Sequence, residues 1–413
     1  MNEINPYTLI IASSIIVILS YLFNIIAKRT NIPSVLLLIA TGIVISLFIK
    51  ILDAAPYNFR PVLEILGIVG LIMIVLEASL DLKLGKEKRN LIASSFTIAF
   101  LSLIFTSTLI SIILIYYLDT DLAQALLYSL PLSIISSAIV IPSISGLDKD
   151  KKEFMIYEST FSDILGIMIF YLLIESYHAE SFGEISLNIF LNIGGTLFIS
   201  FLVSYLLILV FQNIRTQVKL FLLISVLILL YSIAKLMHFS SLLLILVFGL
   251  VLQNREIFFP GSMRKMLKED ALNEISNNFR IITLESAFIV RTFFFVIFGI
   301  TISLSSLLNL KVLLVSVIIL IIIFGVRYLI FKMLKKEHVF PDIFLAPRGL
   351  ITILLFYAIP EDLQNGKFDT GILLFIIIAS CIAMASSLVN ERKRKLMEVK
   401  FPENPENKRT KIS

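Results

Sequence analysis

An apolar stretch in the first half of the chain reads Leu132-Ser133-Ile134-Ile135-Ser136-Ser137-Ala138-Ile139-Val140-Ile141-Pro142-Ser143. Inside a helix, Pro142 would remove one backbone hydrogen bond and free a carbonyl near Ala138. A serine pair followed by proline therefore predicts a break in a membrane helix. Freed carbonyls and hydroxyls in lipid must line a cavity or bind something polar. The alternative is a simple proline kink, with the serines bonded back to their own helix.

The composition of the whole chain is that of a membrane protein. The 413 residues are 58% hydrophobic and 16% charged, with a mean hydropathy of +0.96. A soluble domain carries about 25% charged residues and could not keep this much apolar surface from water. The single cysteine, Cys381, excludes disulfide frameworks and cysteine metal sites. With only three histidines there is almost no material for a catalytic site, so we expect neither an enzyme nor a cofactor.

Windows of about 20 apolar residues predict thirteen transmembrane helices. The connection around 254–280 is expected to hold a short amphipathic helix near Gly261–Leu272, and residues 390–413 are expected to form a short basic tail. The predicted helices lie near 7–27, 33–50, 62–82, 91–117, 122–146, 153–175, 185–211, 218–235, 239–253, 281–303, 311–333, 340–360 and 370–389.

The distribution of basic residues predicts the orientation, because Lys and Arg concentrate on the cytoplasmic side of a membrane. Of the 35 Lys and Arg residues, 27 fall in odd-numbered connections or in the tail, and 5 in even-numbered connections. We therefore expect a multi-pass protein of the bacterial cytoplasmic (inner) membrane, with its N-terminus outside and its C-terminus in the cytoplasm. The net charge of +5 needs no nucleic acid partner. The Arg392–Lys395 cluster could touch anionic lipid, although a stop-transfer signal is the favoured interpretation.

Several ionisable residues lie inside the predicted apolar helices. An ionisable side chain at mid-bilayer costs at least about 2.5–3.5 kcal/mol, so such residues face the bundle interior, pair with one another and mark transport paths. A purely structural pairing is the alternative. The residues are Arg291, Arg327, Arg348, Glu77, Glu158, Asp163 and Glu285.

Asp163 is the central candidate among these residues. It lies about ten residues into its predicted helix, near the bilayer midplane at 1.5 Å per residue. Ser159 lies one turn earlier on the same face, so its hydroxyl can share a ligand with the carboxylate. Glu158 lies about 140° around the helix from Asp163, which makes it a structural partner for an arginine.

A second predicted break reads Leu345-Ala346-Pro347-Arg348-Gly349-Leu350. Two broken helices in corresponding places of two halves indicate an inverted-repeat transporter. Predicted helices 1–6 and 8–13 form such halves, with the seventh helix as their connector. The expected fold is thus all-α and polytopic, with two crossing broken helices.

Five stretches in order resemble the monovalent cation:proton antiporters of the NhaP-like sodium/proton exchanger type, over about residues 8–389. Each stretch alone is a weak signal, but five in order on consistently oriented helices are a strong one. They are Asn31–Leu38 with Thr41-Gly42, Leu76–Asp81, Glu158–Asp163, Arg291–Phe295 with Gly299, and Pro347–Leu350.

This resemblance implies an NhaA-like fold in which Asp163 exchanges a proton for a monovalent cation. Ser159, Glu77 and oxygens around Ser136 and Ser137 would complete the cation site. Na⁺ is the expected cation, with K⁺ and Li⁺ as alternatives, and H⁺ is the other transported ion.

The resemblance also implies structural roles for the buried charges, among which Arg291 is counted. Glu158 and Arg348 would match the family's structural ion pair. Arg327 would match the basic residue that offsets the half-helix dipoles at the crossing. Ser162 replaces an asparagine of the family motif, so a helper amide is lost and a shorter hydroxyl remains at the site.

The expected mechanism is alternating access in a homodimer embedded in the bilayer. Core helices at 91–175 and 311–389 would move against scaffold and dimer helices at 7–82 and 218–303. Exchange is expected to be electroneutral, because Ser162 cannot titrate and Arg327 stays protonated; Glu77 could carry a second proton. The alternative function is a sodium-coupled symporter of an organic anion on the same fold.

Overall fold

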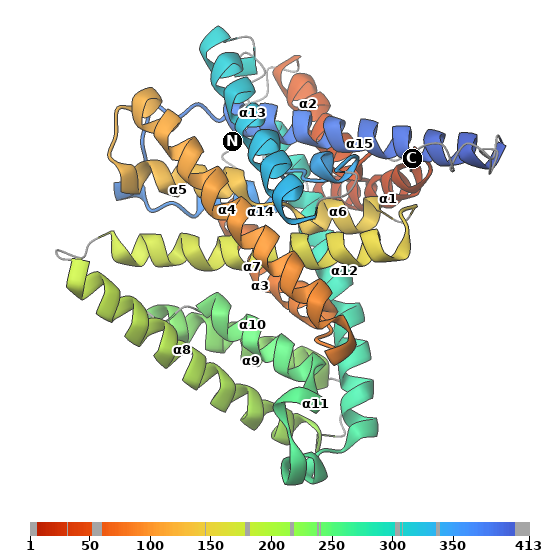
Figure 1. Ribbon diagram of the computed structural model, residues 1–413, viewed down its shortest axis with the longest axis vertical. Helices are drawn as coiled ribbons and strands as arrows, with labels where there is room; N and C mark the ends of the chain where they lie inside the picture. The colour runs from red at the N-terminus through yellow and green to blue at the C-terminus, as the bar shows by residue number, and fades with distance from the viewer. Residues whose placement is uncertain are drawn as a thin grey trace, which may run out of the picture.

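The computed structural model describes residues 6–30, 32–51, 60–144, 146–177, 182–214, 219–237, 239, 241–301, 306–307, 309–335 and 339–400. Over these residues the chain is helical and contains no strand (Figure 1). The predicted all-α class is confirmed. Most predicted helices are present with boundaries shifted by a few residues, and the two predicted broken helices are indeed interrupted.

The first seven predicted helices correspond to eight helical segments, because the fifth is divided in two. These are α1 (Pro6–Thr30), α2 (Ser34–Ile51), α3 (Arg60–Asp81), α4 (Arg89–Leu118), α5 (Leu122–Ser133), α6 (Ser137–Ser143), α7 (Lys149–Ser176) and α8 (Phe182–Phe211).

The rest of the chain contains the second broken helix, which consists of a short 3-10 turn, an extended stretch and a helix of eight residues. The segments are α9 (Lys219–Leu236), α10 (Ser241–Gln253), α11 (Arg255–Phe258), η2 (Gly261–Met266), α12 (Glu269–Thr301), α13 (Leu310–Leu334), η4 (Asp342–Phe344), α14 (Leu350–Tyr357) and α15 (Gly371–Lys400).

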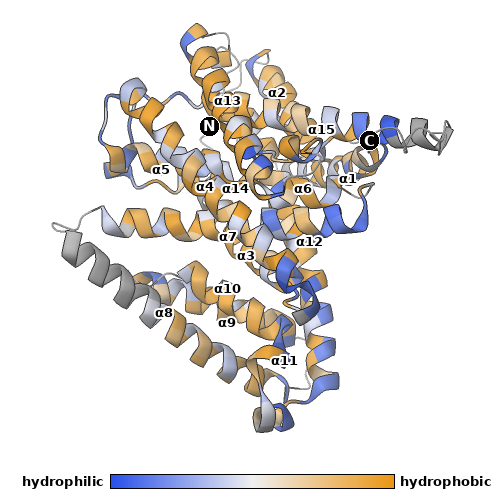
Figure 2. Cartoon of the chain, viewed as in Figure 1, coloured by the Kyte–Doolittle hydropathy of each residue, from blue (hydrophilic) through white to orange (hydrophobic). Residues whose placement is uncertain are grey.

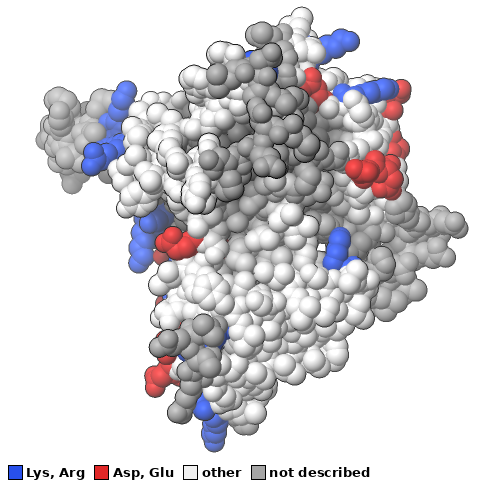
Figure 3. All heavy atoms as spheres, turned by 180° about the vertical axis from the view of Figure 1, so that it is seen from behind, with Lys and Arg blue, Asp and Glu red and all other residues white. Residues whose placement is uncertain are grey.

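The surface is that of a multi-pass membrane protein. Among the described residues, ten helical segments are long and apolar enough to cross a membrane. Large apolar side chains point outward, including Phe198 (71% exposed) and Phe221 (66% exposed), and the helices are apolar along most of their length (Figure 2). On the face shown in Figure 3, charged side chains gather toward the margins and leave a broad uncharged area. The number of thirteen crossings stays a prediction.

The helices fall into two groups according to which of them pack together. In one group α4 packs against α5, α7 and α13, and α13 packs against α15. In the other group α12 packs against α2 and α3, while α10 packs against α3 and α8. The crossing of α2 and α12 needs glycine, because a Cβ on Gly42 would lie 2.9 Å from the Cα of Gly299. Small residues let membrane helices approach this closely.

Two features of the second half differ from the prediction. The prediction of a short amphipathic helix at Gly261–Leu272 is wrong, because a 3-10 turn occupies Gly261–Met266 and α12 already begins at Glu269. Glu269 and Asp270 lie in the first turn of α12, where negative side chains favour a helix start. At the other end, α15 continues to Lys400, so the first part of the predicted tail is helical.

Candidate ion-binding site

The first break lies between α5 and α6, where residues 134–136 leave the helical conformation. Pro142 was expected to cause the break, but it lies inside α6 and downstream of the gap. The physical reason for the break lies elsewhere in the fold. The backbone amides that begin at Ile135 have hydrogen-bond partners on α7 and on the second broken helix.

Three consecutive backbone amides at this break donate to groups outside their own helix. Ile135 N donates to Oγ of Ser162 at 2.9 Å, and Ser136 N donates to the carbonyl of Pro347 at 2.9 Å. Ser137 N donates to Oδ2 of Asp163 at 3.0 Å. In lipid an unpaired amide costs several kcal/mol, so α7 and the second broken helix hold the break open. Asp163 is thereby positioned at the N-terminal end of α6.

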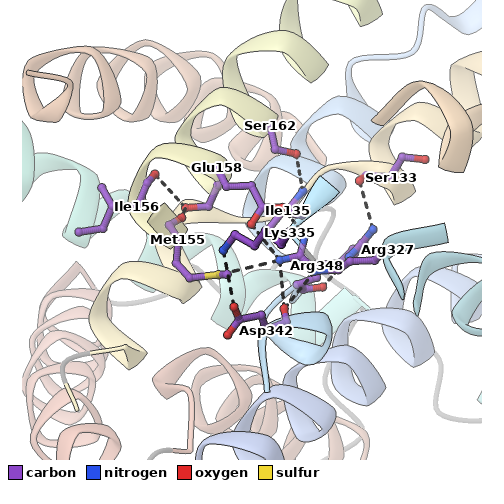
Figure 4. Close-up of polar contacts among 12 residues, drawn as sticks. Ser133, Ile135, Met155, Ile156, Glu158, Ser162, Arg327, Lys335, Asp342 and Arg348 are labelled. Atoms are coloured by element: carbon purple, nitrogen blue, oxygen red, sulfur yellow. Dashed lines mark hydrogen bonds and ion pairs between the residues drawn. The ribbon is translucent and has the colours of Figure 1, made fainter. Parts of the chain in front are cut away.

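Arg348 supplies donors to the carbonyls that α5 leaves unpaired at its C-terminal end (Figure 4). Its Nε donates to the carbonyl of Leu132 at 2.9 Å and its Nη2 to that of Ser133 at 3.1 Å. Its Nη1 donates to the carbonyl of Ala346, two residues earlier in the chain, at 2.5 Å. A cation is favourable there because the C-terminal end of a helix carries partial negative charge.

The predicted pairing of Glu158 with Arg348 is wrong. The carboxylate of Glu158 instead binds Arg327, with Nη2 2.9 Å from Oε2 and a second contact between Nη1 and Oε1. Arg327 also donates to the main-chain carbonyl of Asp342, from Nε at 3.2 Å and from Nη2 at 3.1 Å (Figure 4). The two arginines have exchanged their expected roles: Arg327 forms the ion pair and Arg348 lies at the helix break.

The second break passes so close to the first that it requires glycine. A Cβ on Gly349 would lie 3.0 Å from Cβ of Ser136 and 2.7 Å from its Oγ. Arg348 N donates to Oγ of Ser380 on α15 at 3.0 Å, which satisfies another amide of the extended stretch. The two broken helices therefore cross in direct contact, as the sequence predicted.

Asp163 keeps one carboxylate oxygen unused. Its side chain is 2% exposed, and Oδ1 has no hydrogen-bond partner among the described residues. The hydroxyls of Ser136 and Thr352 are likewise buried without a partner in the described part of the chain. Buried polar atoms are normally satisfied. Asp163 also accepts the amide of Ser137, the residue that follows Ser136. The unused oxygens of Asp163 and Ser136 are therefore candidate ligands for a hard cation.

Two predicted ligands are engaged with the backbone. Ser159 donates its hydroxyl to the carbonyl of Met155 at 2.8 Å, one turn earlier in α7. Ser162 accepts the amide of Ile135. Each hydroxyl retains acceptor capacity, but Ser162 first serves to position the break. The sequence indicated both as polar groups beside Asp163 and could not indicate these partners.

Glu77 on α3 faces Arg291 on α12, with 3.7 Å between Oε1 and Nη2. Arg291 also lines a cavity of about 230 Å³ that lies among α1, the start of α2, α6 and α12. Ala138 and Ile139, which directly follow Ser137, form part of the same wall. The cavity thus reaches the first turn of α6, whose N-terminal amide binds Asp163.

Sequence reasoning missed two contributors to the site and one further candidate oxygen, that of Thr352. Ser380 binds the second break through its hydroxyl, and the main-chain carbonyl of Asp342 binds Arg327. Thr352 follows the break by three residues, and that spacing was the one available signal for it. A main-chain acceptor such as that of Asp342 leaves no trace in the sequence.

Comparisons with known proteins give a family and a fold. The family described as "Sodium/hydrogen exchanger, transmembrane" matches residues 14–390. The fold is similar to that of the sodium proton antiporter MjNhaP1 from Methanocaldococcus jannaschii at pH 8, with TM-score 0.70 and 20% identity over 92% of this chain and 95% of that one. A second structure of that antiporter, from an electron microscopy map, gives TM-score 0.66 and 19% identity over 95% and 97% of the two chains. A search of curated proteins gives no match.

Proposed function

Because the chain belongs to the sodium/hydrogen exchanger family, we propose that it is a secondary active antiporter that exchanges a monovalent cation for H⁺. Na⁺ is the first candidate cation, with K⁺ and Li⁺ as alternatives. One observation carries the proposal: the buried carboxylate of Asp163 binds the break between α5 and α6 and retains an oxygen that has no partner among the described residues.

In the proposed site, a cation and a proton compete for the same carboxylate. Oδ1 of Asp163 and the hydroxyl of Ser136 supply oxygens, and Thr352, Ser137 and Ser159 are further candidates. Burial away from water disfavours a bare carboxylate, so the site is expected to hold either a proton or a cation. Glu77 is a second candidate carboxylate for binding the cation or a proton. Its charge is partly offset by Arg291.

The same contacts support a proposal of alternating access. The break residues of α5 and α6 are bonded to α7 and to the second break, so these elements are expected to move as one body. The proposed scaffold contains α1–α3, α9, α10 and α12. The cavity beside α6 lies between the two bodies, since its walls come from α6 on one side and from α1, α2 and α12 on the other.

The proposed exchange is one for one and electroneutral. Asp163 is the one carboxylate that binds the break in the described part of the chain. Ser162 cannot titrate, and the guanidinium groups stay charged. The proposed setting is the bacterial cytoplasmic membrane, with the N-terminus outside and the C-terminus in the cytoplasm. The proposed assembly is a homodimer through the scaffold helices.

The test is a transport assay in everted membrane vesicles that contain the full-length chain. An acid-inside gradient is set, and the recovery of a quenched pH dye is followed after Na⁺, K⁺ or Li⁺ is added. An antiporter releases the proton gradient on cation addition alone. If no monovalent cation releases it, but Na⁺ drives uptake of an organic anion, the symporter alternative replaces the proposal.

A further inference from the structure

A groove of about 430 Å³ lies between α15 and the η4 segment, away from the ion site. One wall is a single face of α15, with lining residues from Ala383 to Arg394 at spacings of three and four. The other wall consists of Phe340, Pro341 and Phe344, and the rings of Phe340 and Phe344 lie 5.8 Å apart. Phe340 is 56% exposed, which is unusual for an aromatic side chain outside a lipid environment.

The polarity of the groove changes along α15 in one direction. Ala383 lies at the apolar end, Ser386 and Ser387 follow, and Asn390 and Arg394 lie at the polar end. These positions span about 16 Å at 1.5 Å per residue. The basic residues that follow the apolar part of α15 place the polar end at a membrane surface. The groove therefore has the polarity order of a phospholipid, with an apolar inner part and a charged outer part.

Basic side chains outnumber acidic ones at the outer end. Arg392 and Lys393 are exposed beside Arg394. The one acid in the groove, Glu391, lies 3.4 Å from Arg394 and 4.0 Å from Lys151, so two cations share its charge. A zwitterionic headgroup would gain little from this charge, whereas an anionic headgroup is attracted to juxtamembrane basic residues.

We propose that this groove binds one anionic phospholipid, with its phosphate beside Arg394 and Asn390 and an acyl chain against Ala383 and Phe344. The orientation proposed above assigns that lipid to the cytoplasmic leaflet. This lipid site would be present whether or not the protein is an antiporter. The wall residue Pro341 adjoins Asp342, whose carbonyl binds Arg327, so an occupied groove would also steady the segment that supports the Glu158 ion pair.

The chain contains no tryptophan, which permits a direct test of occupancy. Phe340→Trp places a single tryptophan on the groove wall, and the full-length variant is reconstituted in bilayers that contain brominated lipids. Brominated phosphatidylglycerol should quench with a relative binding constant about fivefold above that of brominated phosphatidylcholine, the effect expected for one basic residue near the headgroup. Phe221→Trp on the lipid-facing side of α9 is the reference, and its two constants should be equal.

A matched pair of charge variants separates a site from general surface attraction. In the Phe340→Trp background, Arg394→Gln should remove most of the preference for phosphatidylglycerol, whereas Arg392→Gln, two residues away and outside the groove wall, should lower it much less. Equal constants for the two lipids at Phe340→Trp, or equal losses in both charge variants, would overturn the proposal. Displacement of the lipid by excess inorganic phosphate would overturn it too, because the site would then bind a soluble anion.

Discussion

Arg327 on α13 and Glu158 on α7 form a buried ion pair with two nitrogen–oxygen contacts. Both side chains are at most 2% exposed. The same guanidinium donates to the carbonyl of Asp342, so one side chain joins α7, α13 and the segment before the second break. Since Asp163 lies five residues beyond Glu158 on α7, this pair fixes the helix that carries the candidate transport carboxylate.

The ion pair predicts strong energetic coupling between Glu158 and Arg327. Removing one partner leaves an uncompensated buried charge, which costs about 3–5 kcal/mol. Glu158→Gln and Arg327→Gln should each lower the melting temperature in detergent, and the double variant should lose much less than the sum. The same cycle with Glu158 and Arg348 is the control, and we expect those two losses to add. Additive losses for Glu158 and Arg327 would show that the pair does not form.

Asp163→Asn should abolish cation/proton exchange and leave the protein folded. The change removes the titratable group at nearly the same volume, and the amide can still accept from Ser137 N. Exchange is measured in proteoliposomes, and folding by gel filtration and melting temperature. The control on the same helix is Glu153→Gln, which should retain exchange. Glu153 forms a partly exposed ion pair with Lys88, at 2.8 Å. Robust exchange by Asp163→Asn would exclude its central role.

Gly349→Ala should destabilise the crossing of the broken helices by about 1–3 kcal/mol, the usual range for overpacking. The added methyl group would meet Ser136 and Ile139, so Ser136→Gly in the same chain should restore part of the melting temperature. Gly325→Ala on α13 is the matched control, because nothing lies within 4 Å of its Cβ position. It should be neutral or stabilising, since alanine favours a helix over glycine by up to about 1 kcal/mol.

Charge balance tests the one-for-one exchange. If only Asp163 trades its proton for a cation, a membrane potential has no net charge to act on. A potassium diffusion potential is set with valinomycin across proteoliposomes, and internal pH is followed after a sodium pulse. The exchange rate should not depend on the membrane potential. If K⁺ is itself transported, another permeant ion must be used to set the potential. A rate that reverses with the potential would contradict electroneutral exchange, and Glu77→Gln should then restore indifference to voltage.

The competition also predicts a pH dependence. When most Asp163 carboxyl groups are protonated, each further unit of acidification should lower the apparent cation affinity about tenfold. The measurement is the half-saturating cation concentration in proteoliposomes at a series of symmetrical pH values. A half-saturating concentration that stays constant across acidic pH would show that cation and proton do not share one group.

Helix type, the positions of the broken helices and the family resemblance were all available from the sequence. Each depends on local properties. An apolar run of sufficient length must be helical in lipid, because its backbone groups have no other partner. The stretches Ser136-Ser137 and Pro347-Arg348-Gly349 mark the breaks within such runs. The inward-facing charges were also identifiable, since lipid excludes them from any other place.

The tertiary structure alone decided which groups meet. Two arginines at similar depth are equivalent in the sequence, and only the crossing of α13 with α7 brings Arg327 rather than Arg348 to Glu158. Pro142 was expected to cause the break before α6, yet the break depends on acceptors at Ser162, Pro347 and Asp163, which come from distant segments. Hydrogen bonds between such segments depend on where the helices cross. A sequence specifies which groups need partners in lipid, and the packed fold determines which partners they obtain.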